Sequence, residues 1–418
     1  MLMSHRTAVA AIPALALWLT PLSGLAGGYA IPNENARDLA LSQSAEAAQN
    51  GPEAAYQNPA ALAGLEGLSA SVSVEGLYNV TRWSDPNLGT ASLDPKWNTP
   101  PQAAVSWGHK LPNDMAYGLG VSLVVPGGGS LNWPANWPGS QRIQTVTQEV
   151  YLVEASLAFQ PVSFIKLGGG LLYYRATEDL TQKLGFVSST GDAELGLAGG
   201  AVSYSAAAQV DVPGVPLSLA FTYFHKGDLN LRGNAHFSGI PASFQALLQD
   251  QGVGEHVVVP NNIFVGAAYK VQKNLQVMAT WNLERWINYN QDQFIGDLGF
   301  TVTVPRHYVN AYVFRVGGEW TDALIPGLTL RLGGLRSISP QPTDTLSPSL
   351  TDGNSWALSA GAGYQIFKAL RVDLGYQHGF FDAVTATGPE AFPGTYKTSV
   401  DLVSLGLTFH HDFGAGAK

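Results

Sequence analysis

Residues 370–380 read LRVDLGYQHGF, and this stretch alternates between apolar or aromatic side chains and small or polar ones. Successive side chains of a β-strand point to opposite faces, so the stretch predicts a strand with one apolar face. A strand that crosses lipid needs roughly 9–11 residues of this pattern. Residues 275–284 and 312–321 repeat it. The apolar face of the first stretch consists of Leu370, Val372, Leu374, Tyr376, His378 and Phe380.

The composition indicates that this apolar face meets lipid. Only 13% of the 418 residues are charged, and 47 residues are glycine. A soluble β-sandwich would also alternate, but it would turn its polar face outward and carry more charge. The formal net charge of −9 argues against a nucleic-acid partner. Because the chain contains no cysteine, it can form no disulfide and use no thiol nucleophile.

Residues 1–26 have the features of a secretory signal peptide. Arg6 precedes an apolar run at 8–19, and small residues at 24–26 offer a cleavage site. A membrane anchor is the alternative, but Pro13 and Pro21 interrupt the run. No later stretch offers about 18 consecutive apolar residues, so membrane-spanning helices are not expected. An exported, charge-poor and glycine-rich chain predicts an all-β outer-membrane barrel.

Fourteen stretches fit such strands, and an even number leaves both ends of the barrel on the periplasmic side. The connections alternate in length: those at 111–113, 161–163, 213–214 and 271–273 are short, whereas 127–144, 178–198, 229–258 and 287–309 are predicted as long outer loops. We therefore predict a barrel over 67–413 and a tail at 414–418. The predicted strands are 67–82, 99–110, 114–126, 145–160, 164–177, 199–212, 215–228, 259–270, 274–286, 310–321, 327–338, 355–366, 369–381 and 398–413.

Aromatic residues near the strand ends predict two belts at the lipid headgroups. Trp107 and Trp320 belong to one belt, and Trp83 and Trp286 to the other. Such rings have an apolar body and a polar edge, which suits the membrane interface.

Residues 27–66 do not alternate, and we predict that they form a hatch inside the barrel. They are rich in alanine and are interrupted at Asn50-Gly51-Pro52 and again at 58–59. A fourteen-stranded barrel is too wide for its own side chains to fill. The motif Asn58, Pro59 and Ala60 would end the last hatch helix and turn the chain toward the first strand. A flexible periplasmic tail is the alternative.

Several segments together resemble a known family. GGYAIPNENARDLALSQ at 27–43, AAYQNPAALAGL at 54–65 and PPQAAVSWGHKLPNDMAYGLGVSLVVPGG at 100–128 resemble the opening of the FadL-type outer-membrane transporters of long-chain fatty acids and other hydrophobic compounds. Similarity continues through the later strands. The resemblance implies a monomeric fourteen-stranded barrel with an N-terminal hatch. It also implies capture of an apolar ligand by outer loops, a pocket walled by barrel and hatch, and release sideways into the membrane.

In the resembled family a kink in the third strand opens the side door. The matching positions here are Gly118, Gly120 and Pro126. Glycine permits a bend or bulge, and proline interrupts the hydrogen-bond ladder. Room for hatch side chains is an equally good explanation of the two glycines.

Apolar residues in two outer loops are candidates for the capture groove. PASFQALLQD at 241–250 predicts a short amphipathic helix. Exposed apolar loop residues normally mark a binding surface. Trp133 and Trp137 could cover the same mouth or lie at the lipopolysaccharide boundary. The proposed groove consists of Leu184, Phe186, Val187, Phe244, Leu247 and Leu248.

Charged residues at inward positions are expected to form ion pairs that seat the hatch, with Glu53 or Glu66 as partners. An arginine that receives a ligand carboxylate is the alternative. The inward set is Arg315, Glu319, Arg331, Arg371 and Asp373.

Passive uptake of a hydrophobic small molecule is the function that these features favour. No cofactor and no metal are expected, since the nine histidines are scattered. No Gly-x-Ser-x-Gly elbow occurs, so we predict that the protein is not an enzyme. A diffusion porin for small polar solutes is the alternative, although it would want an open, charged lumen. The expected surroundings are outer-membrane lipid and lipopolysaccharide.

Overall fold

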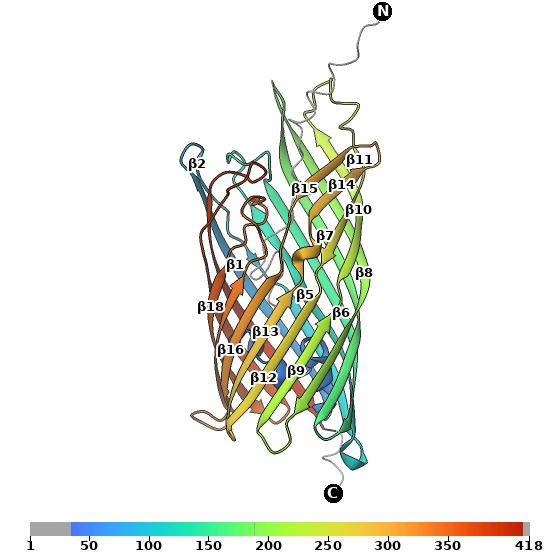
Figure 1. Ribbon diagram of the computed structural model, residues 1–418, viewed down its shortest axis with the longest axis vertical. Coiled ribbons are helices and arrows are strands. Elements are labelled where there is room, and N and C mark those ends of the chain that lie inside the picture. Colours follow the sequence, from blue (N-terminus) through green and yellow to red (C-terminus); the bar gives the residue numbers. More distant parts are fainter. Residues whose placement is uncertain (1–34, 188, 413–418) are drawn as a thin grey trace, which may run out of the picture.

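The computed structural model describes residues 35–187 and 189–412, which form a tall cylinder of antiparallel strands (Figure 1). The predicted signal peptide at 1–26, the first part of the predicted hatch at 27–34 and the tail at 414–418 lie outside the described residues. Among the described residues, no helix is long and apolar enough to cross a bilayer.

The described sheet has 21 strands. Five consecutive pairs each make up one strand of the wall, and the short strands β2 (Gly89–Ser92) and β20 (Val384–Thr385) only extend hairpins, which leaves fourteen wall strands. In order, the wall strands are β1 (Gly67–Asp85), β3 (Trp97–Asn98) with β4 (Pro101–Lys110), β5 (Ala116–Asn132), β6 (Thr145–Val162), β7 (Ile165–Gly185), β8 (Thr190–Asp211), β9 (Leu217–Phe224) with β10 (Gly227–Ser238), β11 (Gln251–Val259) with β12 (Asn262–Gln272), β13 (Leu275–Glu284) with β14 (Gln291–Gly296), β15 (Thr301–Pro305) with β16 (Ala311–Trp320), β17 (Leu328–Ile338), β18 (Ser355–Phe367), β19 (Leu370–Phe381) and β21 (Thr395–His411).

The first and last wall strands close the barrel. β1 pairs with β21 from Leu68 opposite His411 to Ser84 opposite Thr395, and its other edge pairs with β3 and β4. Closure gives every wall strand a neighbour on both sides, which is how a sheet avoids open edges in lipid. The predicted fourteen-stranded barrel is confirmed.

The alternation in the sequence matches the two faces of the wall. On β19, Leu374 and Tyr376 are 52% and 45% exposed on the outside, whereas Asp373 and Gln377 are buried inside. The turns at the lower end in Figure 1, which include η4 (Pro112–Asp114), are short. The predicted strand positions at this end are confirmed.

The outer half of the barrel differs from the prediction. Residues 178–198, 229–258 and 287–309 were expected to be loops, but most of them continue the wall as β7, β8, β10, β11, β14 and β15. A short 3-10 helix, η5 (Trp286–Asn288), joins β13 to β14. The outward side chains there include Asn230, Arg232 and Asn234, which are exposed. The cylinder therefore extends above the lipid, and its polar outer face hid the strands from a search for apolar alternation.

The hatch, here the described residues 35–66, lies inside the lower half of the barrel (Figure 1). It contains α1 (Ala36–Ala40), η2 (Glu46–Ala48), α2 (Ala54–Gln57) and η3 (Pro59–Gly64). α1 contacts β18 and β19, and η3 contacts β5, β6 and β7. Small residues allow close approach: a Cβ atom at Gly118 would lie 2.3 Å from the carbonyl oxygen of Leu62. The hatch alanines 54, 55, 60, 61 and 63 are buried.

Candidate functional site

The Asn58 side chain lies between α2 and η3. The motif was predicted to end the last hatch helix, but η3 follows it, so it ends α2 only. The Asn58 Oδ1 accepts a hydrogen bond of 3.1 Å from the Ala60 amide, and its Nδ2 donates to the Glu46 carbonyl and to Gln209 Oε1 of β8 at 2.9 and 3.0 Å. Pro59 occupies the first position of η3, where no backbone donor is needed. The motif therefore caps η3 and also ties two parts of the hatch to the wall.

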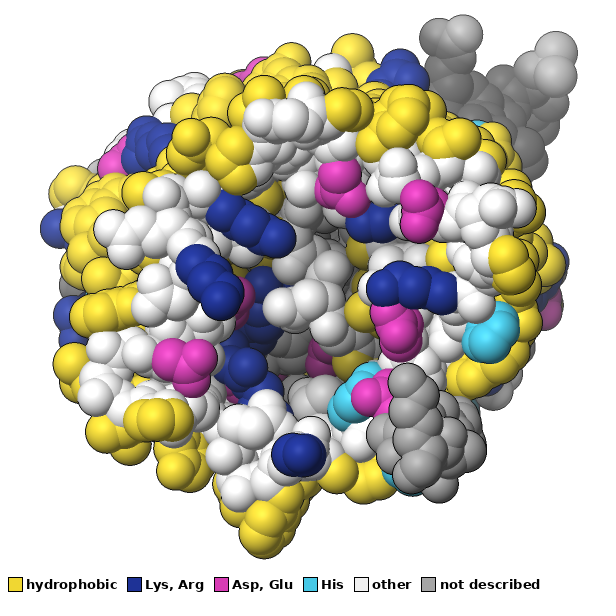
Figure 2. All heavy atoms as spheres, turned by 90° about the horizontal axis from the view of Figure 1, so that it is seen from below, with side chains coloured by type: hydrophobic (Ala, Val, Ile, Leu, Met, Phe, Trp, Pro, Cys, Tyr) yellow, Lys and Arg dark blue, Asp and Glu magenta, His cyan; other side chains and the backbone are white. Residues whose placement is uncertain are grey.

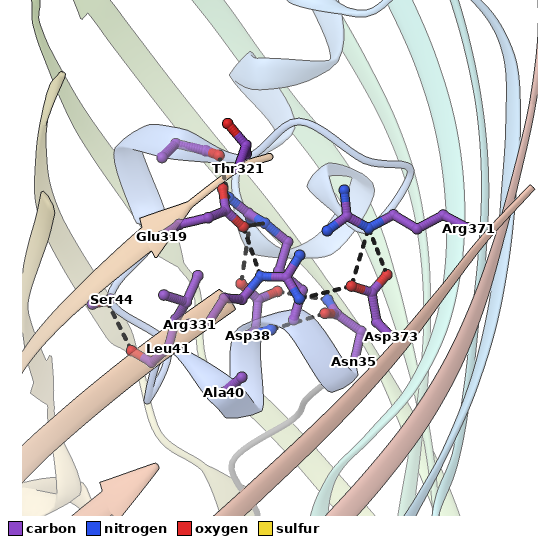
Figure 3. A network of polar contacts seen from close by, with 12 residues as sticks. Asn35, Asp38, Ala40, Leu41, Ser44, Glu319, Thr321, Arg331, Arg371 and Asp373 are labelled. Atoms are coloured by element: carbon purple, nitrogen blue, oxygen red, sulfur yellow. Dashed lines mark hydrogen bonds and ion pairs between the residues drawn. The ribbon is translucent and has the colours of Figure 1, made fainter. Parts of the chain in front are cut away.

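An ion-pair network joins the hatch to three wall strands (Figure 3). Arg37 of α1 donates from Nε to Glu319 of β16 at 2.9 Å, and Arg331 of β17 donates to the same carboxylate at 2.7 Å. Arg331 also reaches Asp373 of β19 at 2.7 Å, and Asp373 accepts two bonds from Arg371. Each buried carboxylate is thus shared by two guanidinium groups, which compensates the charges.

The hatch residue in this network is not the one expected. Arg37 makes the contact, whereas Glu53 bonds to Ser71 of β1 and Glu66 pairs with Lys110. Arg315 also lies elsewhere: it donates to Asn282 at 3.3 Å and stands over the ring of Phe264. Four of the five predicted lumen charges come together, and Arg315 belongs to a separate cluster higher in the barrel. Because Arg37 lies in a helix remote from these strands in sequence, no local pattern pointed to it.

The network lies at the lower mouth of the barrel and lines a cavity there. Figure 2 shows this mouth from below, with charged side chains gathered inside a ring of hydrophobic ones. A polar cavity of about 240 Å³ opens between the hatch and the wall, lined among others by Asn35, Arg37, Glu53, Arg371 and His410. A hydrophobic molecule on this side of the hatch would meet the charged side chains of Arg37, Glu53 and Arg371.

A gap in the wall lies at β5. The pairing of β5 with β4 ends at Leu123 opposite Ala103, and its register with β6 shifts between Val124 and Gly127. Two residues of β5, Val125 and Pro126, therefore lie opposite one residue of β6, Tyr151, which is a β-bulge. Gly129 follows with φ 148°, a conformation that suits glycine.

The gap contains a cavity of about 110 Å³ between the second wall strand and β5. Pro100 and Pro101 border the cavity on one side, and Pro126 belongs to the strand on the other side. Because proline has no backbone N–H group, these three positions leave no donor unpaired where the ladder is interrupted. The prolines at 100 and 101 are a signal that the sequence reasoning missed. The cavity is lined among others by Asn98, Pro100, Pro101, Val125, Gly129 and Tyr151.

The two glycines of β5 do not form the bend. Gly118 pairs regularly with Gly108 and Ala158, and Gly120 with Ser106 and Ser156. A Cβ atom at Gly120 would lie 2.7 Å from that of Ala55, so both glycines give the hatch room. The sequence left two explanations for these glycines, a bend in the strand or space for the hatch. The structure supports space for the hatch.

An apolar cluster links the hatch to the gap. Leu39 of α1 is buried with Leu77 of β1, Val125 of the bulge and Leu402 of β21. A hydrophobic molecule that rests on the hatch would therefore meet apolar side chains up to the gap.

Above the hatch, the inner wall is largely apolar and aromatic. Trp133 and Trp137 stack at 4.4 Å, and Trp83 meets Trp137 edge-on at 5.7 Å. On the other side Trp286 packs against Tyr289 and Tyr308. Trp83 and Trp286, predicted for the outer aromatic belt, face inward instead. Trp133 and Trp137 cover the mouth from inside, and their indole nitrogens donate to the carbonyls of Pro348 and Ile143.

The predicted capture groove is assembled in part. The rings of Phe186 and Phe244 lie 5.2 Å apart, and Leu184 and Leu248 are buried beside them. Val187 and Leu247 are exposed and do not join this cluster. Residues 241–250 form consecutive turns and not the predicted helix, since Pro241 begins a stretch held by turn-type hydrogen bonds such as Phe244 N to Pro241 O.

A family description, outer membrane protein transport protein (OMPP1/FadL/TodX), matches residues 19–413. The chain belongs to this family. The OMPP1/FadL/TodX proteins are outer-membrane transport proteins, which places this barrel in the outer membrane and accounts for its lipid-facing wall and plugged lumen. No match was found among curated protein sequences.

Three solved structures share the fold at low sequence identity. A Pseudomonas aeruginosa FadL homologue is 18% identical with a TM-score of 0.82, covering 92% of this chain and 100% of its own. The Pseudomonas putida toluene transporter TodX is 16% identical with a TM-score of 0.71, covering 93% and 99%. The CymD monoaromatic hydrocarbon channel is 14% identical with a TM-score of 0.69, covering 90% and 97%. At these identities the three structures show the fold of this chain and do not identify its ligand.

Among the described residues, no group of three or more histidine, aspartate and glutamate side chains is placed to hold a metal ion.

Proposed function

We propose that this family member admits hydrophobic small molecules passively and releases them sideways into the outer membrane through the gap beside β5. The observation that carries the proposal is the cluster of buried apolar side chains that joins Leu39 on the hatch to Val125 in the bulge. The ladder between β4 and β5 is interrupted at the same place. The charged network below the hatch disfavours passage of an apolar molecule toward the periplasm, because it would have to displace compensated charges.

Entry would begin at the cluster of Leu184, Phe186, Phe244 and Leu248 near the top of the barrel. From there the apolar cluster that contains Trp133, Trp137 and Trp286 would supply the contacts. Each step exchanges contact with water for contact with apolar side chains, and the last step delivers the molecule to lipid. The driving force is therefore partition, which needs no ATP or proton gradient.

The experiment is uptake by vesicles that contain the purified protein. Labelled fatty acids, alkanes and aromatic hydrocarbons are offered in parallel with a labelled sugar, and protein-free vesicles give the background. We expect faster uptake of apolar compounds with protein present and no change for the sugar. Preferential uptake of the sugar would contradict the proposal and support the diffusion porin that the sequence left as the alternative.

A further inference from the structure

Three carboxyl groups face the interior of the outer half of the barrel. Glu178 of β7, Glu255 of β11 and Asp292 of β14 are 1%, 4% and 1% exposed. Arg306, which lies between β15 and β16, is fully buried and donates to Asp292 at 2.7 Å. Tyr289 also donates to Asp292. The guanidinium group of Arg306 is therefore paired with the Asp292 carboxylate, although its Nη1 has no hydrogen-bond partner among the described residues. The carboxyl groups of Glu178 and Glu255 lie near that pair.

Glu255 stands out because neither of its carboxyl oxygens has a hydrogen-bond partner among the described residues. Glu178 accepts one bond of 3.0 Å from Gln148, and its Oε1 has no partner there either. A buried polar group without a partner costs free energy, so such groups in a native protein call for a ligand or another explanation. Here the oxygens lie within the inner wall that the proposed pathway crosses.

The surroundings of Glu255 are apolar. Its strand neighbours are Leu231 of β10 and Phe294 of β14, which are both buried. Burial, together with the negative charges of Glu178 and Asp292, raises the pKa of Glu255 well above its ordinary value, although Arg306 opposes this. A ligand with a carboxylate would add a further negative charge to this group of acids. A hydroxyl group could donate to an ionised Glu255 and accept from a protonated one.

We propose that Glu255, with Glu178 beside it, is a polar anchor for apolar molecules whose polar end is a neutral hydroxyl, and that it disfavours fatty-acid anions of the same length. The inference rests on the proposed function and names its ligand class. Two arginines are rival anchors for a carboxylate. Arg306 has an unpartnered Nη1 beside the three acids, and Arg142 is half-buried next to Tyr396 in the loop after β5. The arginines 37, 331 and 371 belong to the network at the lower mouth.

The test is a competition assay with the full chain in lipid nanodiscs. The apolar probe 1-N-phenylnaphthylamine is bound first, and dodecanol or dodecanoate is added at pH 8, with protein-free nanodiscs as background. We expect dodecanol to displace the probe at a concentration lower by about tenfold or more, since a hydroxyl group can bond to Glu255 in either protonation state, whereas a carboxylate can only accept a bond from the protonated one. Glu255→Gln keeps the shape and introduces an amide that can donate a hydrogen bond to a carboxylate, and we expect it to narrow this preference. Glu194→Gln is the matched control, because Glu194 lies on the outer face of β8 and is exposed.

Each other result counts against the anchor. Equal or stronger displacement by dodecanoate in the unaltered protein would overturn it, as would an unchanged preference in Glu255→Gln. Selective loss of dodecanoate binding in Arg142→Ala would show that the ligand head group is an anion bound there. If the probe does not bind and neither compound is taken up, the proposed function fails together with the anchor. If vesicles take up hydrocarbons but dodecanol displaces the probe no better than dodecanoate does, the proposed function stands and only the anchor is wrong.

Discussion

Arg37 joins the hatch to the wall through Glu319, and both side chains are almost fully buried, at 12% and 6% exposed. Arg37 is therefore expected to hold the hatch against the wall. In Arg37→Ala the Glu319 carboxylate keeps only Arg331 as a charged partner. Removing one partner of a buried pair typically costs about 3–5 kcal/mol. We expect faster hydrogen exchange at the amides of 36–64, measured by mass spectrometry at constant pH.

A matched control removes an arginine from an exposed pair. Arg336 and Asp382 lie 3.3 Å apart and are 43% and 56% exposed. Such pairs contribute at most about 1 kcal/mol, so Arg336→Ala should leave the exchange of the hatch unchanged. Equal exchange in both variants would show that the network does not hold the hatch.

Glu46 makes the seating of the hatch depend on pH. Burial raises the pKa of its carboxyl group to about 8, while Thr222 and Arg315 act in the opposite direction and Asp38 adds to the rise. The seated hatch therefore keeps a proton that a released hatch would lose above its ordinary pKa of 4.5. Raising the pH from about 4.5 to 8 therefore makes the seated state of the hatch less favourable relative to the released state.

We expect hatch amides to exchange faster in the unaltered protein than in Glu46→Gln when both are measured at pH 9. At pH 5 the two should agree, since Glu46 is then protonated. Comparing the two proteins at one pH removes the intrinsic effect of pH on exchange. The same difference at both pH values would mean that Glu46 acts through shape and not through its proton.

At the scale of the element, β5 decides where the wall can open. Its bulge places one more residue on β5 than on β6 between Val124 and Gly127. Deleting Pro126 should restore a one-to-one register, because a single removed residue cancels the extra one. We expect β5 to extend its pairing toward β4 and apolar uptake by vesicles to fall toward the level without protein.

Pro126→Ala is the control for this deletion. It keeps the extra residue, so the bulge and the uptake should remain. Circular dichroism checks that both variants form the barrel. Undiminished uptake after the deletion would place the exit elsewhere.

For the whole molecule, the question is whether the hatch must move during transport. The hydroxyl groups of Ser42 in the hatch and Ser359 in β18 lie 2.8 Å apart. The chain has no cysteine, so Ser42→Cys with Ser359→Cys would form its only disulfide. Lateral release requires no passage through the hatch. We therefore expect the oxidised double variant to take up apolar compounds as fast as its reduced form.

Reduction of the same sample supplies the control for this experiment. A low rate when oxidised that recovers after reduction would show that the path runs through the hatch toward the periplasm. Such a result would contradict lateral release and leave the fold and family membership untouched.

The strand positions in the lower half and the even number of strands were predictable from the sequence, because each is a local pattern. The Asn58-Pro59 pair ends α2 but begins η3, so it does not end the last helix of the hatch. Period-two alternation places residues such as Leu374 and Asp373 on opposite faces whatever their distant neighbours are. The outer extensions at 178–198 and 229–258 were missed because their outer faces meet water and carry polar side chains. The register shift on β5 includes Pro126 but neither Gly118 nor Gly120, and a lateral opening at this strand stays a prediction.

The sequence by itself determined a closed, lipid-facing barrel with a plugged lumen, since alternation, composition and the helical N-terminal segment act over a few residues at a time. Only the tertiary structure decided which side chains meet inside. Arg37 and Glu319 are 282 positions apart, and their pairing depends on how the hatch sits within the closed wall. The same holds for Trp83, Trp286 and Glu255, whose surroundings arise when distant strands face one another across the interior.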